Sequence, residues 1–282
     1  MLAQTAGLPL KIAGGIFNNG NLNDLANGAY SIGEILNKEG YNQELLLSSD
    51  GDFGNRKVYF KKHGNYNVVD YYNAIKKGWI DKDYEVWWGY EDSKLFEFAQ
   101  KEILSLADKK EPFNFTMLTT NTHFPGGYLE EDCELKYDDQ IENVISCTSK
   151  QLKEFVEWIK KQSFYKNTTI VISGDHLSME PEYFDNLDES YERTIYDLFI
   201  NSAIKTTNTK NRTFSTLDLY PTTLASLGVK IEGDRLALGT NLFSDRQTLL
   251  EEYGKENVYN ELFKRSIFYE NKIQNGTIDK QG

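Results

Sequence analysis

The sequence predicts an α/β protein, a three-layer sandwich whose central, mostly parallel sheet is covered by helices on both faces. Short apolar runs rich in β-branched and aromatic residues alternate along the chain with segments of helical periodicity. Two of the runs end in polar loops that carry histidines, as strands do when their carboxyl ends meet at a ligand crevice. With 282 residues, 39% of them hydrophobic, the chain can bury one large core. We therefore treat residues 1–282 as a single domain.

The predicted elements follow one another in a regular order. Residues 1–10 resemble a helix interior that runs into a Gly-Pro break without a capping residue, which fits either a short terminal helix or a chain cut from a longer one. Helices are expected over 31–40, 92–107, 152–159 and 217–227, the last with an internal proline, and strands over 44–48, 113–119, 168–173 and 196–200. No internal repeat, low-complexity tract or interdomain linker is visible.

The most informative chemical feature is the pair Asp175-His176, which follows the apolar run 169–172 and the small residues Ser173 and Gly174. A carboxylate oxygen beside an imidazole nitrogen suits a divalent transition metal such as manganese or zinc. A surface loop with a solvated aspartate and a capping histidine would give the same dipeptide. The pair is therefore a candidate metal site that needs support from the rest of the chain.

A second histidine, His123, also follows a predicted strand, in the polar loop 119–127 that closes on Pro125 and two glycines. Two strand ends that each deliver a histidine predict one site assembled from several strands, with both loops at the same sheet edge. A turn in which His123 donates to a backbone carbonyl is the alternative. The third histidine, His63, lies between lysines and a glycine, and we interpret it as structural or solvated.

Arg56 ends the Gly-rich stretch 51–56, which follows the strand predicted at 44–48. Its planar guanidinium suits a phosphate or a carboxylate, although a surface arginine is common. We expect it on a polar loop beyond the strand end.

The two cysteines, Cys133 and Cys147, lie close together in the acidic stretch after the His123 loop. Free thiols in a cytosolic protein would be unremarkable, but this spacing suggests a local disulfide and hence an oxidising compartment. Such a bond would contribute about 3 kcal/mol. The CxxC spacing of a zinc ribbon is absent.

Charge and hydropathy argue against nucleic-acid binding and against a membrane-spanning segment within these residues. A formal charge of -12 argues against nucleic acid, whose phosphates require clustered lysine and arginine. No apolar stretch approaches the roughly 18 residues of a membrane span, and no secretory signal is visible.

Taken together, these motifs resemble the periplasmic, glucan-modifying phosphoglycerol transferases, relatives of lipoteichoic acid synthase in the alkaline phosphatase/sulfatase superfamily. The resemblance rests on 120–128, Cys133, Cys147, Trp158 and 171–179, and extends to 7–10, 53–56, 88–92, 218–222 and 238–243. The matching segments cover nearly the whole chain in the same order, which is far more specific than any one motif.

The resemblance implies a function and a site. In that family one divalent ion, usually manganese or magnesium, is held by a Glu, a Thr and the Asp-His pair. The Thr attacks a phosphatidylglycerol head group, diacylglycerol leaves, and phosphoglycerol passes to a glycan or teichoic-type acceptor. Asp175 and His176 match the metal ligands, His123 matches a residue that contacts phosphoglycerol and assists proton transfer, and Arg56 matches the arginine that holds that group. The cofactor implied is one divalent ion, most often Mn²⁺, with Mg²⁺ or Zn²⁺ as alternatives, in a bacterial extracytoplasmic location.

Two departures from the family pattern shape the expectations. Leu177-Ser178 follows the Asp-His pair where lipoteichoic acid synthases usually carry Tyr-Gly, which favours the glucan-type branch or another glycan modifier. The family's nucleophilic Thr and metal-binding Glu lie upstream of the segment that matches residues 1–10, so we expect a catalytic domain that lacks its N-terminal part, from a parent protein anchored in the membrane upstream. Thr5 lies on the wrong side of the match to be the nucleophile.

Two alternatives remain open from the sequence. One is a hydrolase of the same superfamily, a sulfatase or phosphatase in which water replaces the glycan. No Cys/Ser-x-Pro-x-Arg run typical of sulfatases is present in these residues. The other is a degenerate binding module that keeps the crevice without the chemistry.

Overall fold

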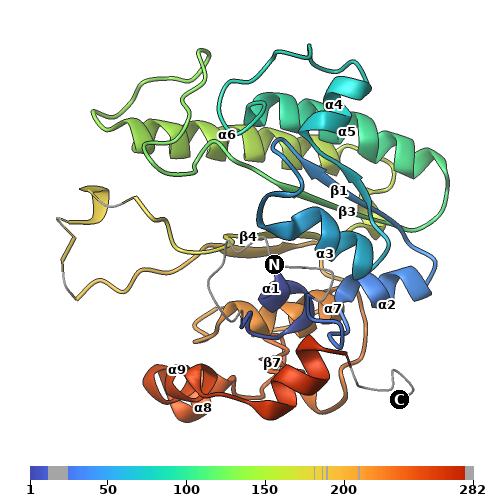
Figure 1. Cartoon of the computed structure of the whole chain (residues 1–282), viewed down its shortest axis with the longest axis vertical. Coiled ribbons are helices and arrows are strands. Elements are labelled where there is room, and N and C mark those ends of the chain that lie inside the picture. Colours follow the sequence, from blue (N-terminus) through green and yellow to red (C-terminus); the bar gives the residue numbers. More distant parts are fainter. Residues whose placement is uncertain (12–24, 181, 186, 189, 209, 277–282) are drawn as a thin grey trace.

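The structure is a computed structural model that describes residues 1–11, 25–180, 182–185, 187–188, 190–208 and 210–276. Its helices are α1 (Leu2–Ala6), α2 (Ile32–Lys38), α3 (Arg56–Lys62), α4 (Tyr71–Lys76), α5 (Asp92–Asp108), α6 (Gln140–Lys160), α7 (Leu219–Ser226), α8 (Leu249–Tyr253) and α9 (Lys255–Phe263). Its strands are β1 (Asn42–Leu47), β2 (Asn67–Val69), β3 (Phe113–Leu118), β4 (Ile170–Ser173), β5 (Asp197–Ile200), β6 (Arg235–Leu236) and β7 (Gly239–Thr240). Figure 1 shows their arrangement.

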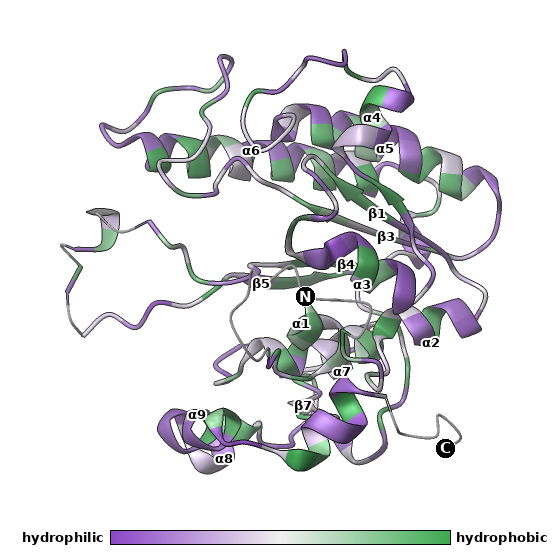
Figure 2. Ribbon diagram, viewed as in Figure 1, coloured by the Kyte–Doolittle hydropathy of each residue, from purple (hydrophilic) through white to green (hydrophobic). Residues whose placement is uncertain are grey.

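The main sheet is parallel, with the strand order β2-β1-β3. β1 lies in its centre and is buried over all but its first residue, which is why it forms a nearly continuous apolar run. Its side chains alternate between two cores: Leu46 packs with α5 and α6, whereas Leu45 and Leu47 pack with α1 and α3. Helices therefore cover both faces of this sheet, as the sequence predicted (Figure 2).

The pairing of the later strands differs from a single parallel sheet. β4 pairs with β5 in antiparallel register, Ser173 opposite Asp197, and among the described residues this pair forms a sheet separate from β2-β1-β3. A parallel pairing requires a crossover, usually a helix, and the described part of the connection between β4 and β5 contains only one 3-10 turn, Glu182–Phe184. β4 still lies against the main core, since Ile170 packs with the cluster that contains β1, α5 and α6.

Helix boundaries follow local signals in the sequence. Ser31 caps α2 and forms a capping box with Glu34, and the predicted stop falls at Gly40, whose φ of 78° is in the left-handed region. α6 begins at Gln140, twelve residues before the predicted helix, because Asp139 caps it by accepting from the Ile141 amide. The N-terminal segment is the short helix α1, closed by Gly7.

No described helix combines the length and apolarity needed to cross a membrane.

Candidate active site

The Asp175-His176 pair lies directly beyond the end of β4, where helix α1 holds the strand. Gln4 Nε2 donates to Ser173 Oγ at 3.0 Å and to the Gly174 carbonyl at 2.9 Å. The α-amino group of Met1 lies near the pair: burial lowers its pKa, and the charge of Asp175 raises it. The chain just before α1 therefore lies near Asp175.

Hydrogen bonds orient both side chains of the pair. Asp175 Oδ1 accepts from the His176 amide at 2.9 Å, and His176 Nδ1 lies 2.7 Å from the Leu177 carbonyl oxygen. Because a carbonyl only accepts, Nδ1 carries the proton, which in the neutral ring leaves a lone pair on Nε2. That Nε2 lies 3.4 Å from Asp175 Oδ2. Two atoms that bind one ion at tetrahedral angles, each at about 2.1 Å, lie about 3.4 Å apart.

The donor types and their spacing thus fit two ligands of one divalent ion, but the set is incomplete. Among the described residues no group of three or more His, Cys, Asp or Glu side chains could hold a metal ion. Both side chains are about half exposed, at 55% for Asp175 and 52% for His176. A tetrahedral site requires about four ligands, and the described residues supply two, Asp175 and His176.

His123 follows β3 and has one ring nitrogen fixed in the same manner. Its Nδ1 lies 2.7 Å from the Phe124 carbonyl oxygen and so donates to it. The ring packs between Trp88, at 4.9 Å between centroids, and Phe124, at 5.0 Å. The backbone contact is the arrangement that the sequence left as the alternative, and it leaves Nε2 as the nitrogen that can face a ligand.

Arg56 is the first residue of α3, so the prediction of a loop position was wrong. The loop is shorter than expected because Phe53–Asn55 form a 3-10 turn that runs directly into the helix. Its Nη2 donates to Ser49 Oγ at 3.1 Å and to the Asp50 carbonyl at 2.7 Å, and its Nε donates to the Phe53 carbonyl at 3.0 Å. The guanidinium is thereby held in one orientation.

The charge of Arg56 connects it to the Asp-His pair. Burial lowers the pKa of Arg56, whereas the carboxylates of Asp50 and Asp175 raise it. The guanidinium stays protonated, as arginine does in proteins. An influence of Asp175 on this group places the two side chains in one electrostatic environment.

A chain of ring contacts and one contact between loops connect the predicted positions. Arg56 lies over the Phe53 ring at 5.4 Å, Phe53 contacts Trp88 at 5.9 Å, and Trp88 in turn contacts His123. The His123 loop also touches the loop after Asp175, because the Gly126 amide donates to Glu180 Oε2 at 2.6 Å. These contacts connect Arg56 with His123 and the His123 loop with the loop that follows His176, all beyond the carboxyl ends of β1, β3 and β4.

His63, the third histidine, is structural, which is one of the two interpretations that the sequence left for it. His63 is 2% exposed, and its ring nitrogens contact Glu34 Oε2 at 3.2 Å and the Leu25 carbonyl at 3.0 Å. Thr5, set aside as nucleophile, uses its hydroxyl within α1 and the core: Oγ1 lies 2.9 Å from the Met1 carbonyl oxygen and 2.6 Å from the Tyr59 hydroxyl.

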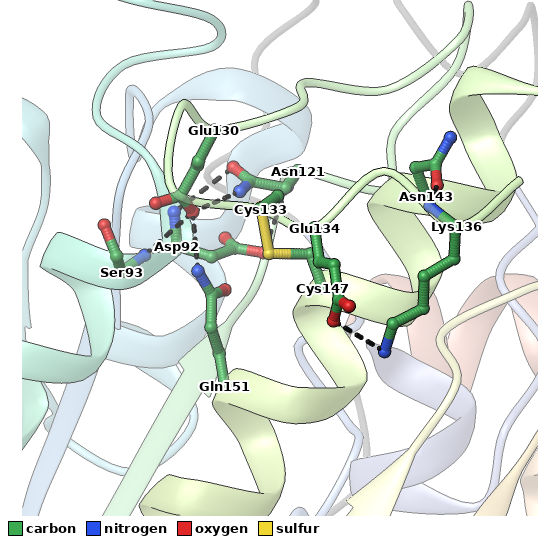
Figure 3. The surroundings of a disulfide bond; sticks show 10 residues. All are labelled: Asp92, Ser93, Asn121, Glu130, Cys133, Glu134, Lys136, Asn143, Cys147 and Gln151. Carbon is green, nitrogen blue, oxygen red and sulfur yellow. Dashed lines mark hydrogen bonds and ion pairs between the residues drawn. A yellow bond between two sulfur atoms is a disulfide. The ribbon is translucent and has the colours of Figure 1, made fainter.

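The predicted disulfide between Cys133 and Cys147 is confirmed, with the two Cα atoms 5.6 Å apart (Figure 3). Cys133 lies in the loop after His123, but Cys147 lies on α6 and not in that loop, because α6 begins earlier than its apolar periodicity indicated. The bond therefore ties the loop to a long, packed helix.

A buried polar network connects the His123 loop to the start of α5. Sequence reasoning did not find it. Asp92, at the start of α5, is fully buried, and its carboxylate accepts from the Thr120 amide at 2.8 Å and the Asn121 amide at 3.2 Å. Burial raises the pKa of Asp92 to about 7, although these two amides lower it. The only signal in the sequence was an acidic residue in the first turn of a predicted helix, which normally indicates a helix end.

Glu130 completes this network on the other side of Asn121 (Figure 3). Its Oε1 accepts from Asn121 Nδ2 at 2.6 Å, from the Ser93 amide at 3.1 Å and from Gln151 Nε2 at 3.0 Å. The loop that carries His123 is therefore fixed by α5, by α6 and by the disulfide.

Comparison with known proteins identifies the family to which this fold and site belong. The family model described as Sulfatase matches residues 3–229. The chain belongs to the Sulfatase family. Among curated relatives of this Sulfatase-family chain, the phosphoglycerol transferase I of Xanthomonas campestris pv. campestris (strain B100) is 29% identical over 234 residues, which are 80% of this chain and 33% of the relative. The chain thus spans about a third of the length of that relative.

Solved structures show the same alkaline phosphatase/sulfatase-like fold. The lipoteichoic acid synthase LtaP from Listeria monocytogenes matches with a TM-score of 0.66 at 18% identity, over 86% of this chain and 62% of that one. The Streptococcus pyogenes phosphoglycerol transferase GacH, solved in complex with sn-glycerol-1-phosphate, matches with a TM-score of 0.53 at 14% identity, over 82% and 61% of the two chains. The predicted fold class and the predicted sulfatase-type superfamily are confirmed.

Proposed function

We propose that this Sulfatase-family domain transfers phosphoglycerol from phosphatidylglycerol to a hydroxyl of a cell-surface glycan or teichoic-type acceptor, with the help of one divalent ion. The observation that supports it is the convergence of Arg56, His123 and the Asp175-His176 pair on one region. The names of the curated relatives and of the LtaP and GacH structures support the same reaction class.

Each residue has a role that follows from its geometry. Arg56, fixed through Nε and Nη2, presents its remaining nitrogen to the phosphate of the head group. His123, with Nδ1 occupied by a carbonyl, relays a proton through Nε2. In the net transfer the P–O bond to diacylglycerol breaks, a P–O bond to the acceptor oxygen forms, and the proton of the acceptor hydroxyl ends on diacylglycerol.

Asp175 and His176 would hold the divalent ion, Mn²⁺ in the first instance. When bound, the ion would neutralise charge on the phosphoryl oxygens. The remaining ligands and the nucleophile of the family pattern would come from residues upstream of Met1, whose amino group lies near Asp175. In this proposal residues 1–282 are one catalytic domain of a longer, membrane-anchored parent.

The disulfide supports an extracytoplasmic location, because such bonds persist in oxidising compartments. In this proposal the domain takes its phosphatidylglycerol donor from the outer face of the membrane that anchors the parent protein.

Titration with sn-glycerol-1-phosphate in the presence of Mn²⁺ tests the head-group site. Arg56→Ala removes a hydrogen bond to a charged group, about 1.5–3 kcal/mol, so the Kd should rise about 12- to 160-fold. Arg265→Ala is the matched control, because Arg265 is exposed and, among the described residues, its ion pair is with Glu270 on the surface. Equal affinities for the two variants would contradict the proposed role of Arg56.

A turnover assay distinguishes the reaction classes. A longer polypeptide that continues upstream of Met1 should release diacylglycerol from phosphatidylglycerol and leave an aryl sulfate intact. Release of sulfate would favour the hydrolase alternative.

A further inference from the structure

We propose that a patch of exposed apolar and cationic side chains within residues 259–268 docks on an anionic lipid surface. The lipid-docking patch consists of Tyr259, Phe263, Ile267 and Phe268, with Lys264 and Arg265 between them. It lies outside residues 3–229, over which the Sulfatase model matches. The inference goes beyond the proposed function, because it concerns a second surface and uses no residue of the candidate active site.

The apolar side chains of the patch are strongly exposed. Phe263 is 83% exposed, Ile267 66% and Phe268 64%. Phe263 also contacts Tyr259, one turn earlier on α9, with ring centroids 6.5 Å apart. A single exposed apolar residue is ordinary on a protein surface, whereas a group of neighbouring ones marks a surface that meets a partner or a membrane.

The backbone that carries the patch is fixed to the core. Tyr269, directly after Phe268, is buried, and its hydroxyl donates to the Pro9 carbonyl at 2.5 Å. Tyr269 and Ile273 pack in the core cluster to which α1 contributes. The exposed side chains therefore stand next to a buried anchor, and the fold itself turns them outward.

Basic side chains accompany the apolar ones. Residues 259–272 carry three cations and two carboxylates, which are Lys264, Arg265 and Lys272 against Glu261 and Glu270. Lys11 adds a fourth cation, since its Nζ donates to the Lys264 carbonyl at 2.5 Å. Lys264 and Arg265 form surface ion pairs, yet both side chains stay more than half exposed. The patch is thus locally cationic on a chain whose formal charge is -12.

This combination selects an anionic lipid surface. Aromatic and aliphatic side chains enter the boundary between head groups and acyl chains, while lysine and arginine keep their charged ends among the head groups. An acidic protein is repelled by an anionic surface over most of its own surface, so contact depends on a local excess of cations. A second copy packed on the patch would bring two cationic patches together, which disfavours self-association.

The position of the patch in the fold is compatible with this contact. Lys255, the first residue of α9, pairs with Glu192 in the segment beyond His176, so α9 adjoins the chain that follows the candidate metal ligands. Figure 1 shows α8 and α9 at the end of the molecule opposite α4, α5 and α6. Docking through the patch therefore turns the acidic stretch before α6 away from the lipid head groups.

Co-sedimentation of the 282-residue chain with vesicles of equal parts phosphatidylserine and phosphatidylcholine tests the patch, because phosphatidylserine is anionic but is not the proposed donor. Phe263→Ser should weaken vesicle binding about tenfold or more, since it removes an aromatic side chain that the bilayer would bury. Lys264→Gln should weaken it about fivefold, since one exposed cation is lost.

Two exposed residues far from the patch provide matched controls. Leu135→Ser changes a 73% exposed apolar residue in the loop before α6. Lys101→Gln changes a lysine on α5 that, like Lys264, pairs with a glutamate on its own helix. Both control variants should bind the vesicles as wild type does.

Weaker vesicle binding by Phe263→Ser and by Lys264→Gln, with both controls unchanged, supports the lipid-docking patch. Absence of wild-type binding, equal binding to pure phosphatidylcholine vesicles, or undiminished binding by both patch variants overturns the inference. A wild-type dimer in light scattering that Phe263→Ser dissociates, without vesicle binding by either protein, also overturns it, because the patch is then an interface between two copies.

Titration with sn-glycerol-1-phosphate separates this inference from the proposed function. Phe263→Ser and Lys264→Gln should keep the wild-type affinity for glycerol phosphate, since neither residue belongs to the candidate active site. If the wild type binds vesicles through the patch but does not bind glycerol phosphate, the proposed function fails and the lipid-docking patch stands.

Discussion

Replacing Asp92 with asparagine should uncouple the His123 loop from the core and change the pH dependence of stability. Asp92 holds the backbone amides of Thr120 and Asn121 with its two carboxylate oxygens. Asparagine keeps one acceptor oxygen and turns an NH₂ group toward the other amide. One buried donor is then unsatisfied, at a cost of about 1–3 kcal/mol.

The pH dependence follows from the direction of the pKa change. Burial raises the pKa of Asp92 from 3.8 to about 7 in the folded state. Between those values the folded state binds more protons than the unfolded state, so the stability contributed by this carboxyl falls as the pH rises through the window. At 1.36 kcal/mol per unit, and with the carboxyl half titrated at pH 7, the loss between pH 5 and pH 7 is about 2 kcal/mol. Asparagine does not titrate, so the stability difference between wild type and Asp92→Asn should shrink by that amount.

Urea unfolding of wild type and Asp92→Asn at pH 5 and pH 8 measures the change in the free energy of unfolding. NMR signals of the His123 ring show whether the loop has moved. Glu44→Gln is the matched control, because Glu44 on β1 is also buried with its pKa raised to about 7 but accepts from Asn67, away from the loop. Both variants should lose pH dependence, and only Asp92→Asn should shift the His123 signals and weaken glycerol phosphate binding. A stability difference that is independent of pH, together with unshifted His123 signals, would refute the reasoning.

Three further outcomes are expected. Double replacement of Cys133 and Cys147 by serine should lower the free energy of unfolding by about 3 kcal/mol, the entropy of a loop of this length, and wild type should show no reactive thiol; two readily labelled cysteines would count against the bond. The 282-residue chain should bind Mn²⁺ weakly in calorimetry, since Asp175 and His176 supply two ligands. Asp175→Asn should abolish the binding, whereas Asp108→Asn, which changes an exposed residue at the end of α5, should not; tight binding would mean that other ligands exist. Gly89→Ala should destabilise the fold by about 1–3 kcal/mol, because a Cβ meets the Ser48 carbonyl; a wild-type melting temperature would contradict the close approach.

Most elements of the fold could be read from the sequence because their signals are local. The apolar period of α5, the buried run of β1 and the capping residue Ser31 each depend on neighbours within a few positions. The sequence analysis did not predict α3, α4, α8 and α9 or the strands β2, β6 and β7, because short elements carry little periodicity.

Some residues of the candidate site could be predicted from the sequence and others could not. Asp175, His176 and His123 could be named because each follows an apolar run, and the pairing of Cys133 with Cys147 because the chain has only two cysteines. Asp92 could not be recognised, since its partners Thr120 and Asn121 lie almost thirty residues away and its burial arises only when α5 packs beside β3.

The sequence by itself determined the α/β class, the residue types of the chemistry and their order along the chain, because periodicity, turn residues and motifs are properties of short segments. Tertiary structure alone decided that β4 pairs with β5 and that Arg56 opens a helix. It also decided that the rings of Phe53, Trp88, Trp87 and Tyr128 form one line. Those outcomes depend on which distant segments bury one another's apolar surface, and no short stretch of sequence carries that information.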